Sequence, residues 1–365
     1  MKRFAVAAVL CLSIPLFAQQ SVPEIKFHAQ TDFFKLPPEL SFGEAAGVAV
    51  NSKGHVFVFS RGGTTGPAYA ASAAQLLEFD AKGNYLREIG HNLYAWSYAH
   101  AVKIDKQDDI WAADKGSDMV IKFNPDGRVV MVFGRKQEAA DENTGPVKHP
   151  KPPLPAINGQ FRQVTDMAWD AAGNTYISDG YINSRVAKVD KDGNWIKTWG
   201  EPGAGPGQFN TPHSIAIDDA DNVYVADRGN GRIQVFDTDG KYLREIHINV
   251  PYDHSTRPWM GNKPAEIPPT SEVPAPMNKS QMNGSPWAIC ITPGPHQVLF
   301  ASDGYPGRIY KLALDGTVLG VLGTTGHGPG QFGWIHELAC PTENLLYAAE
   351  LLNWRVQRLT LEPAK

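Results

Sequence analysis

The sequence is built around one unit that occurs six times. Each copy contains two short apolar strands joined by a tight turn, with polar residues at the strand ends. The copies are residues 47–51 with 55–61, 100–105 with 109–114, 166–170 with 175–179, 213–218 with 223–227, 287–292 with 298–303, and 336–341 with 345–350. Such repetition is typical of folds in which each unit buries its apolar face only against its neighbours.

Further strands complete the unit. A third strand follows the pair, as in residues 232–236, and a turn ending in Gly leads to a fourth strand, as in residues 242–246. Alternating apolar residues and Gly-bearing turns predict antiparallel hairpins. Six units of four strands predict an all-β fold, a six-bladed β-propeller. The sixth copy lacks a fourth strand, so we expect the segment Ile25–Phe34 to supply it and close the ring, which removes two exposed edges.

The chain of 365 residues is expected to form one propeller domain over residues 19–365. Two connections are too long for plain blade linkers and are expected to be insertions near 135–160 and 250–285. Residues 1–18 have the basic start and apolar run of a signal peptide, so we expect a secreted or periplasmic protein. No later stretch is apolar for long enough to span a membrane.

The charge of the chain restricts its partners. The formal net charge is −4 and no run of Lys or Arg occurs, which excludes the usual electrostatic pattern of a nucleic-acid binder. We expect a monomer, with no nucleic acid among its partners. Cys290 and Cys340 are the cysteines outside the signal peptide, and an oxidising compartment would allow them to pair.

Histidine recurs at one position of the unit. The residue that opens the first strand is histidine in copies two, four and six, namely His100, His213 and His336, and in none of the others. Alternate blades of a six-fold ring lie about 120° apart, so the three imidazoles are expected to meet at the mouth of the central channel. Three His nitrogens with an open fourth position form a catalytic zinc pattern.

Cations and phenols follow the second strands on the same face. Arg61 and Arg228 come from copies one and four and suit an anionic substrate, because a carboxylate accepts both prongs of an arginine fork. Tyr181 and Tyr305 lie in matching Ser-Asp-Gly-Tyr turns, and either phenol is a candidate base near a metal. The alternative is that these arginines and tyrosines are turn residues whose contacts are only structural. Arginine at one position of four third strands is interpreted as structural: Arg185, Arg232, Arg308 and Arg355.

Three segments carry a resemblance to a known family. Ser178–Arg185, Gly207–Ser214 and Val225–Gln234 resemble the peptidyl-α-hydroxyglycine α-amidating lyases (peptidylamidoglycolate lyases), which are propellers of the NHL-repeat class. The resemblance implies zinc ligands at His100, His213 and His336, a catalytic tyrosine at Tyr181 rather than Tyr305, and catalytic arginines at Arg61 and Arg228. It also implies a structural calcium ion at Val48, Val102 and Glu337, where glutamate replaces the family's aspartate.

The implied reaction splits a C-terminal peptidyl-α-hydroxyglycine, or a similar α-hydroxy amide, into a peptide amide and glyoxylate. A separate hydroxylating monooxygenase would have to supply the substrate. Two alternatives stay open: a non-enzymatic NHL propeller that binds a peptide or protein, and a metal-dependent lactonase-type hydrolase on the same fold.

Overall fold

The computed structural model describes residues 22–62, 74–136, 155–253, 259–260, 263–264 and 283–363. The expected signal peptide, residues 1–18, lies outside the described residues, as does most of each expected insertion. Among the described residues, no helix has both the length and the apolar character needed to cross a membrane.

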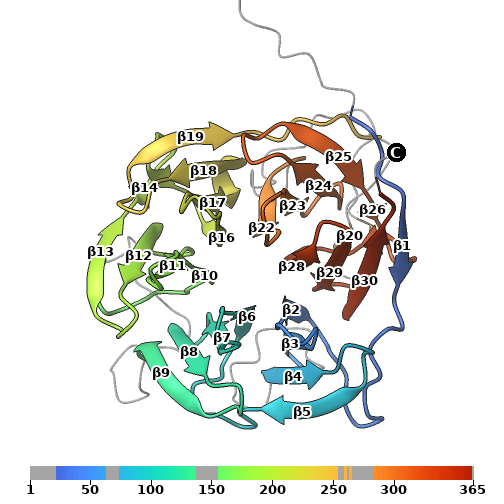
Figure 1. The fold of residues 1–365 in the computed structure, drawn as a ribbon, viewed down its shortest axis with the longest axis horizontal. Helices are drawn as coiled ribbons and strands as arrows, with labels where there is room; N and C mark the ends of the chain where they lie inside the picture. The colour runs from blue at the N-terminus through green and yellow to red at the C-terminus, as the bar shows by residue number, and fades with distance from the viewer. Residues whose placement is uncertain are drawn as a thin grey trace, which may run out of the picture.

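Six four-stranded antiparallel sheets, here called blades 1 to 6, surround a central axis (Figure 1). Blade 1 contains β2 (Ala45–Val50), β3 (Val56–Ser60), β4 (Gln75–Phe79) and β5 (Tyr85–Ile89). Blade 2 contains β6 (Ala99–Ile104), β7 (Ile110–Asp114), β8 (Met119–Phe123) and β9 (Val129–Gly134). Blade 3 contains β10 (Asp166–Trp169), β11 (Thr175–Asp179), β12 (Arg185–Val189) and β13 (Trp195–Trp199). The expected six-bladed propeller is confirmed.

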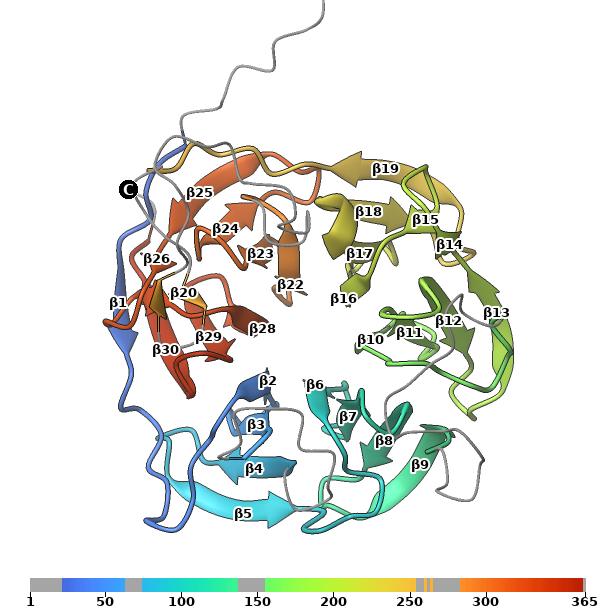
Figure 2. The ribbon, with the colours of Figure 1, turned by 180° about the vertical axis from the view of Figure 1, so that it is seen from behind.

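Blades 4 to 6 repeat this order. Blade 4 contains β16 (Pro212–Ile217), β17 (Val223–Asp227), β18 (Arg232–Phe236) and β19 (Tyr242–Ile246). Blade 5 contains β22 (Pro286–Ile291), β23 (Leu299–Asp303), β24 (Ile309–Leu312) and β25 (Val318–Leu322). Blade 6 contains β28 (Ile335–Thr342), β29 (Leu345–Glu350), β30 (Arg355–Leu361) and β1 (Phe27–Gln30). The first strand of every blade lines the axis and the fourth lies at the rim, as both views show (Figure 2).

Short elements decorate the blade connections. The described residues contain three two-stranded pairs: β14 (Glu201–Pro202) with β15 (Gln208–Phe209), β20 (Trp259–Met260) with β21 (Lys263–Pro264), and β26 (Thr324–Thr325) with β27 (Gln331–Phe332). A 3-10 turn, η2 (Arg228–Asn230), follows the second strand of blade 4.

The N-terminal segment closes the ring. Strand β1 pairs antiparallel with β30, from Phe27 opposite Leu361 to Gln30 opposite Arg358. Phe33 and Phe34 then pack into the apolar cluster between blades 6 and 1. The predicted closure is therefore confirmed, and it joins the two ends of the described chain in one sheet.

The apolar core is divided among the blade interfaces. Within the part of the chain that the structure describes, six clusters of buried side chains occur, and each one joins two neighbouring blades. Between blades 1 and 2, for example, the ring of Trp96 lies 4.7 Å from that of Phe59 and 5.7 Å from that of Phe123. Because each blade is buried on both faces by its neighbours, the inner strands read as continuous apolar runs and only the rim strands alternate.

In several blades, a carboxylate at the end of the second strand contacts the backbone or an arginine near the start of the channel strand. The Asp227 carboxylate ends β17, accepts the Asn210 backbone N–H at 2.7 Å and pairs with Arg232 at 2.9 Å. Asp179 and Glu350 hold Arg185 and Arg355 in the same way. In blade 5, Asp303 contacts the backbone of Arg308 instead. These contacts agree with the interpretation of the four third-strand arginines as structural.

Candidate metal centre and its surroundings

Each of the three expected histidines sits at an irregularity in a channel strand. His100, His213 and His336 are the second residues of β6, β16 and β28, and the pairing with the next strand shifts register around each of them. A bulge leaves the extra residue out of the ladder and re-aims its side chain. The local backbone therefore frees each imidazole from its own sheet.

The three imidazoles gather around one point of the axis. Their ring centroids are 4.5 to 4.8 Å apart, and their candidate ligand nitrogens all lie within 4.8 Å of one another. All three residues are buried. In the part of the chain that the structure describes, this is the group of His, Cys, Asp or Glu side chains arranged to hold a metal ion.

Backbone carbonyls of the odd blades orient these rings. The Nδ1 atoms lie 2.7 Å from carbonyl oxygens of the next blade, in the order His100 to Thr165, His213 to Trp287 and His336 to Ala46. A carbonyl can only accept, so each Nδ1 carries the proton and each Nε2 presents a lone pair.

Burial, followed by nearby positive groups, holds the pKa of all three imidazoles well below its ordinary value, so they are neutral as metal ligands must be. The Nε2 of His213 is buried and makes no hydrogen bond among the described residues. The lone pair of this Nε2 lies beside those of the other two imidazoles, and such an arrangement fits a metal ion.

Tyr181 lies at the edge of this centre. Its hydroxyl is 3.3 Å from the His100 Nε2 and accepts a hydrogen bond of 3.5 Å from the Arg228 guanidinium. Burial on its own would raise the pKa of this phenol, but the positive charges nearby, led by Arg228, outweigh burial and lower it. Tyr305 instead packs edge-on against Tyr252, with ring centroids 5.5 Å apart.

The two expected arginines have different environments. Arg61 donates to Glu44 at 2.6 Å and to the Ala99 carbonyl at 2.9 Å, which ties blade 1 to the start of β6. The Arg228 guanidinium stacks 4.2 Å from the Trp287 ring centroid, and its Nε finds no hydrogen-bond partner among the described residues.

Sequence reasoning passed over a third cation in this centre. Lys115 occupies the position in blade 2 that Arg61 and Arg228 occupy in blades 1 and 4. Its ammonium lies 4.0 Å from the Tyr181 ring centroid and 5.2 Å from that of Tyr98. Alignment of the six copies already contained the signal, because three of the six residues at that position are basic.

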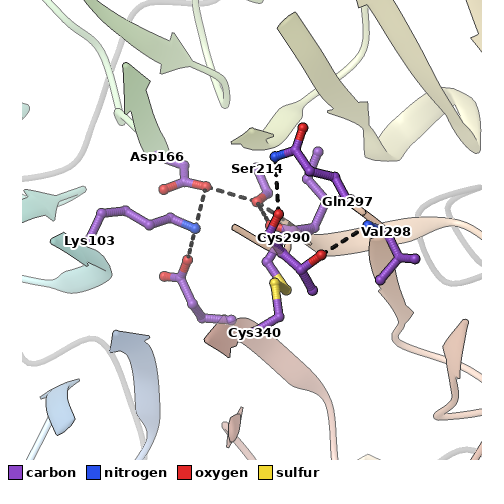
Figure 3. The surroundings of a disulfide bond; sticks show 10 residues. Lys103, Asp166, Ser214, Cys290, Gln297, Val298 and Cys340 are labelled. Carbon is purple, nitrogen blue, oxygen red and sulfur yellow. Dashed lines mark hydrogen bonds and ion pairs between the residues drawn. A yellow bond between two sulfur atoms is a disulfide. The ribbon is translucent and has the colours of Figure 1, made fainter. Parts of the chain in front are cut away.

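The channel below the histidines contradicts the expected calcium site. The Lys103 ammonium lies 2.6 Å from the Glu337 carboxylate. It also lies 3.4 Å from the Asp166 carboxylate, which Figure 3 shows. The carboxylate of the expected ligand set Val48, Val102 and Glu337 is thus already neutralised by a side chain. A divalent cation there would face this ammonium at close range, so the residues present do not fit calcium.

Burial and close contacts shift the pKa values of Lys103 and Glu337. Burial opposes the charge on Lys103, but the carboxylates of Asp166 and Glu337 outweigh it and raise the pKa of the ammonium. Burial raises the pKa of the Glu337 carboxyl to about 8, with Lys103 opposing the shift. The Ser214 hydroxyl donates to Asp166 at 2.8 Å and extends the network to blade 4.

A disulfide joins the channel strands of blades 5 and 6. Cys290 of β22 and Cys340 of β28 are bonded, which is the pairing that the sequence allowed but did not establish (Figure 3). Both lie in the wall of a cavity of about 350 Å³ that is lined by the later halves of the channel strands. That cavity is therefore at the end of the channel opposite to the histidines.

Comparisons with known proteins identify sequence relatives. The NHL repeat family matches residues 209–236. Peptidylglycine alpha-amidating monooxygenase of Rattus norvegicus is 30% identical over 249 residues, and the match covers 61% of this chain and 24% of the rat protein. The probable peptidyl-alpha-hydroxyglycine alpha-amidating lyase pgal-1 of Caenorhabditis elegans is 29% identical over 217 residues, covering 54% and 57%. NHL repeat-containing protein 3 of Homo sapiens is 33% identical over 221 residues, covering 56% of each chain.

Solved structures share the fold at lower sequence identity. A virginiamycin B lyase from Staphylococcus aureus superposes with a TM-score of 0.55 at 12% identity, covering 92% of this chain and 100% of that one. This likeness concerns the fold alone. Among the sequence relatives, this chain spans about a quarter of the rat protein and just over half of the nematode and human proteins.

Proposed function

We propose that this chain is a zinc-dependent lyase. By sequence, it belongs with the NHL-repeat propellers of the peptidyl-α-hydroxyglycine α-amidating lyase family. The proposed substrate is a peptidyl-α-hydroxyglycine or a similar α-hydroxy amide, and the products are an amide and glyoxylate. The observation that carries the proposal is the convergence of three neutral imidazoles beside one phenol and a set of cations.

The histidines would hold the metal through Nε2. A zinc ion held by His100, His213 and His336 would act as a Lewis acid that lowers the pKa of the substrate's α-hydroxyl. The carbonyls that accept from each Nδ1 keep the rings aimed at the axis, so the ligands are in place before metal binds.

Tyr181 would move the proton. Its lowered pKa favours the phenolate, which takes the proton of the α-hydroxyl as the C–N bond breaks and the hydroxyl carbon becomes the aldehyde of glyoxylate. The same proton then passes to the departing nitrogen, which completes the amide, so the reaction needs no other reactant. Arg228 and Arg61 would attract the carboxylate that leaves with glyoxylate.

Two further parts of the proposal concern the setting of the reaction. The disulfide between Cys290 and Cys340 supports an exported protein, because such bonds persist in oxidising compartments. The substrate is the product of a hydroxylation, so a reaction of that class must supply it, and a separate monooxygenase is proposed for this step.

The test is turnover of a minimal substrate. Zinc-loaded protein is incubated with N-benzoyl-α-hydroxyglycine, and glyoxylate is measured against Tyr181→Phe and metal-free controls. Release of glyoxylate that depends on zinc and on Tyr181 is expected. If the metal is bound and no glyoxylate forms, the lyase proposal fails, and a binding module or a hydrolase on the same propeller takes its place.

A further inference from the structure

Three cations stand around Tyr181, and they are not equivalent. Arg61, Lys115 and Arg228 follow the second strands β3, β7 and β17 and act on the phenol together. Arg61 already has an anionic partner, since its guanidinium pairs with Glu44 at 2.6 Å. Its charge is therefore partly balanced within the protein, so Arg61 attracts a substrate anion less strongly than a cation without such a partner would.

Lys115 has no such partner. Its ammonium makes neither a hydrogen bond nor an ion pair with any residue in the described ranges, and its neighbours are the rings of Tyr181 and Tyr98. Asp114, the residue before it, is occupied by the backbone N–H groups of Ser97 and Ser117. Asp118 acts on this ammonium only at longer range. Removing an ammonium from water without a direct ion-pair partner is costly, so a partner from outside the protein is expected.

Arg228 is the second uncompensated cation. The nearby carboxylate of Asp227 is taken by Arg232 at 2.9 Å, so the Arg228 guanidinium is left with stacking on Trp287 and one long hydrogen bond to Tyr181. Only 8% of Arg228 is exposed. Two positive charges that form no ion pair within the described ranges thus flank the same phenol.

We propose that Lys115 and Arg228 together form a carboxylate subsite, in which Lys115 is a specificity-determining residue. The pair binds a planar monoanion, with the Arg228 guanidinium held by Trp287 and the Lys115 ammonium directed by the two tyrosine rings. The identification of this anion as the carboxylate of an α-hydroxyglycine rests on the proposed function. The existence of the subsite itself is independent of the proposed function.

The experiment measures binding without turnover. N-benzoylglycine and N-benzoylglycinamide have the same shape, lack the α-hydroxyl and differ in the charge of one group. Their affinities for the zinc-loaded protein are measured by calorimetry in wild type, Lys115→Met and Lys115→Arg. A hydrogen bond to a charged group is worth roughly 1.5–3 kcal/mol, which corresponds to a change of roughly 10- to 100-fold in affinity.

Wild type is expected to prefer the carboxylate, and Lys115→Met to lose roughly 10- to 100-fold for the carboxylate while its affinity for the amide stays within about twofold. Lys115→Arg keeps the charge and is expected to retain most of the preference. Equal weakening of both ligands in Lys115→Met, as a structural role would cause, overturns the inference, and so does a wild type without preference. If Lys115→Met does not fold, Lys115→Gln replaces it in the same comparison.

The outcome separates the subsite from the reaction. If wild type releases no glyoxylate from the hydroxylated substrate but shows a carboxylate preference that depends on Lys115, the lyase proposal fails and the subsite stands. If glyoxylate is released and Lys115→Met discriminates as wild type does, the reaction stands and the subsite is refuted.

Discussion

Replacement of Lys103 by methionine is expected to destabilise the channel strongly. The side chain is 17% exposed and its ammonium sits between the carboxylates of Glu337 and Asp166, which are 3% and 2% exposed. Loss of one partner of a buried ion pair leaves charge without compensation and costs roughly 3–5 kcal/mol. Because whole domains are stable by only about 5–15 kcal/mol, this is a large share of the free energy of unfolding.

The assay is urea unfolding of wild type and Lys103→Met at neutral pH, with zinc present throughout. Lys311→Met is the matched control, since its partner Glu343 is 47% exposed and such a pair is worth about 0.2–1 kcal/mol. A loss for Lys103→Met no larger than that for the control would refute the reasoning, because the channel cluster would then contribute no more than a surface pair.

Calcium supplies the second arm of the same experiment. Millimolar calcium is expected to leave the unfolding free energy of wild type unchanged, because the Lys103 ammonium occupies the space between the two carboxylates. In Lys103→Ser that space opens, and a divalent cation bound only by the folded state would raise stability. Stabilisation of wild type by calcium, absent from Lys103→Ser, would contradict the assigned role of Lys103.

Three other outcomes follow from the fold and the centre. Deletion of residues 22–34 removes β1 and two phenylalanines of the closing interface and is expected to abolish cooperative folding, so an unchanged melting temperature would be contrary evidence. Tyr181→Phe is expected to reduce kcat by roughly 10²–10⁴-fold with zinc content unchanged; loss of zinc would make the tyrosine a ligand instead. His213→Ala is expected to abolish turnover and lower the metal content, and retention of both would remove this residue from the centre.

The repeat allowed the scaffold to be predicted in detail. Six copies of one pattern fix the number of blades, and a sixth copy without its fourth strand indicates where the N-terminal segment pairs. The alternation of histidine among the copies predicts convergence, because position in a closed ring follows from position in the repeat. Long-range geometry was therefore readable from local sequence.

What the sequence could not reveal were contacts between blades at side-chain level. In the sequence, Lys103 cannot be distinguished from any other lysine in a strand. Its role follows only from the fold, which places the carboxylates of Asp166 and Glu337 next to its ammonium. The compensation of Arg61 by Glu44 is equally invisible, because nothing in the repeat pairs the two positions. Lys115 was visible in the alignment of the six copies. Its significance comes from the structure, in which its ammonium forms no ion pair with any described residue.

The most direct test of the central claim is anomalous diffraction at the zinc edge from crystals of the zinc-loaded protein. The account predicts one strong peak on the propeller axis, about 2.0–2.1 Å from the Nε2 atoms of His100, His213 and His336, with Nδ1 of each still bonded to its carbonyl. A map without a peak between these rings, at full zinc loading in solution, would contradict it.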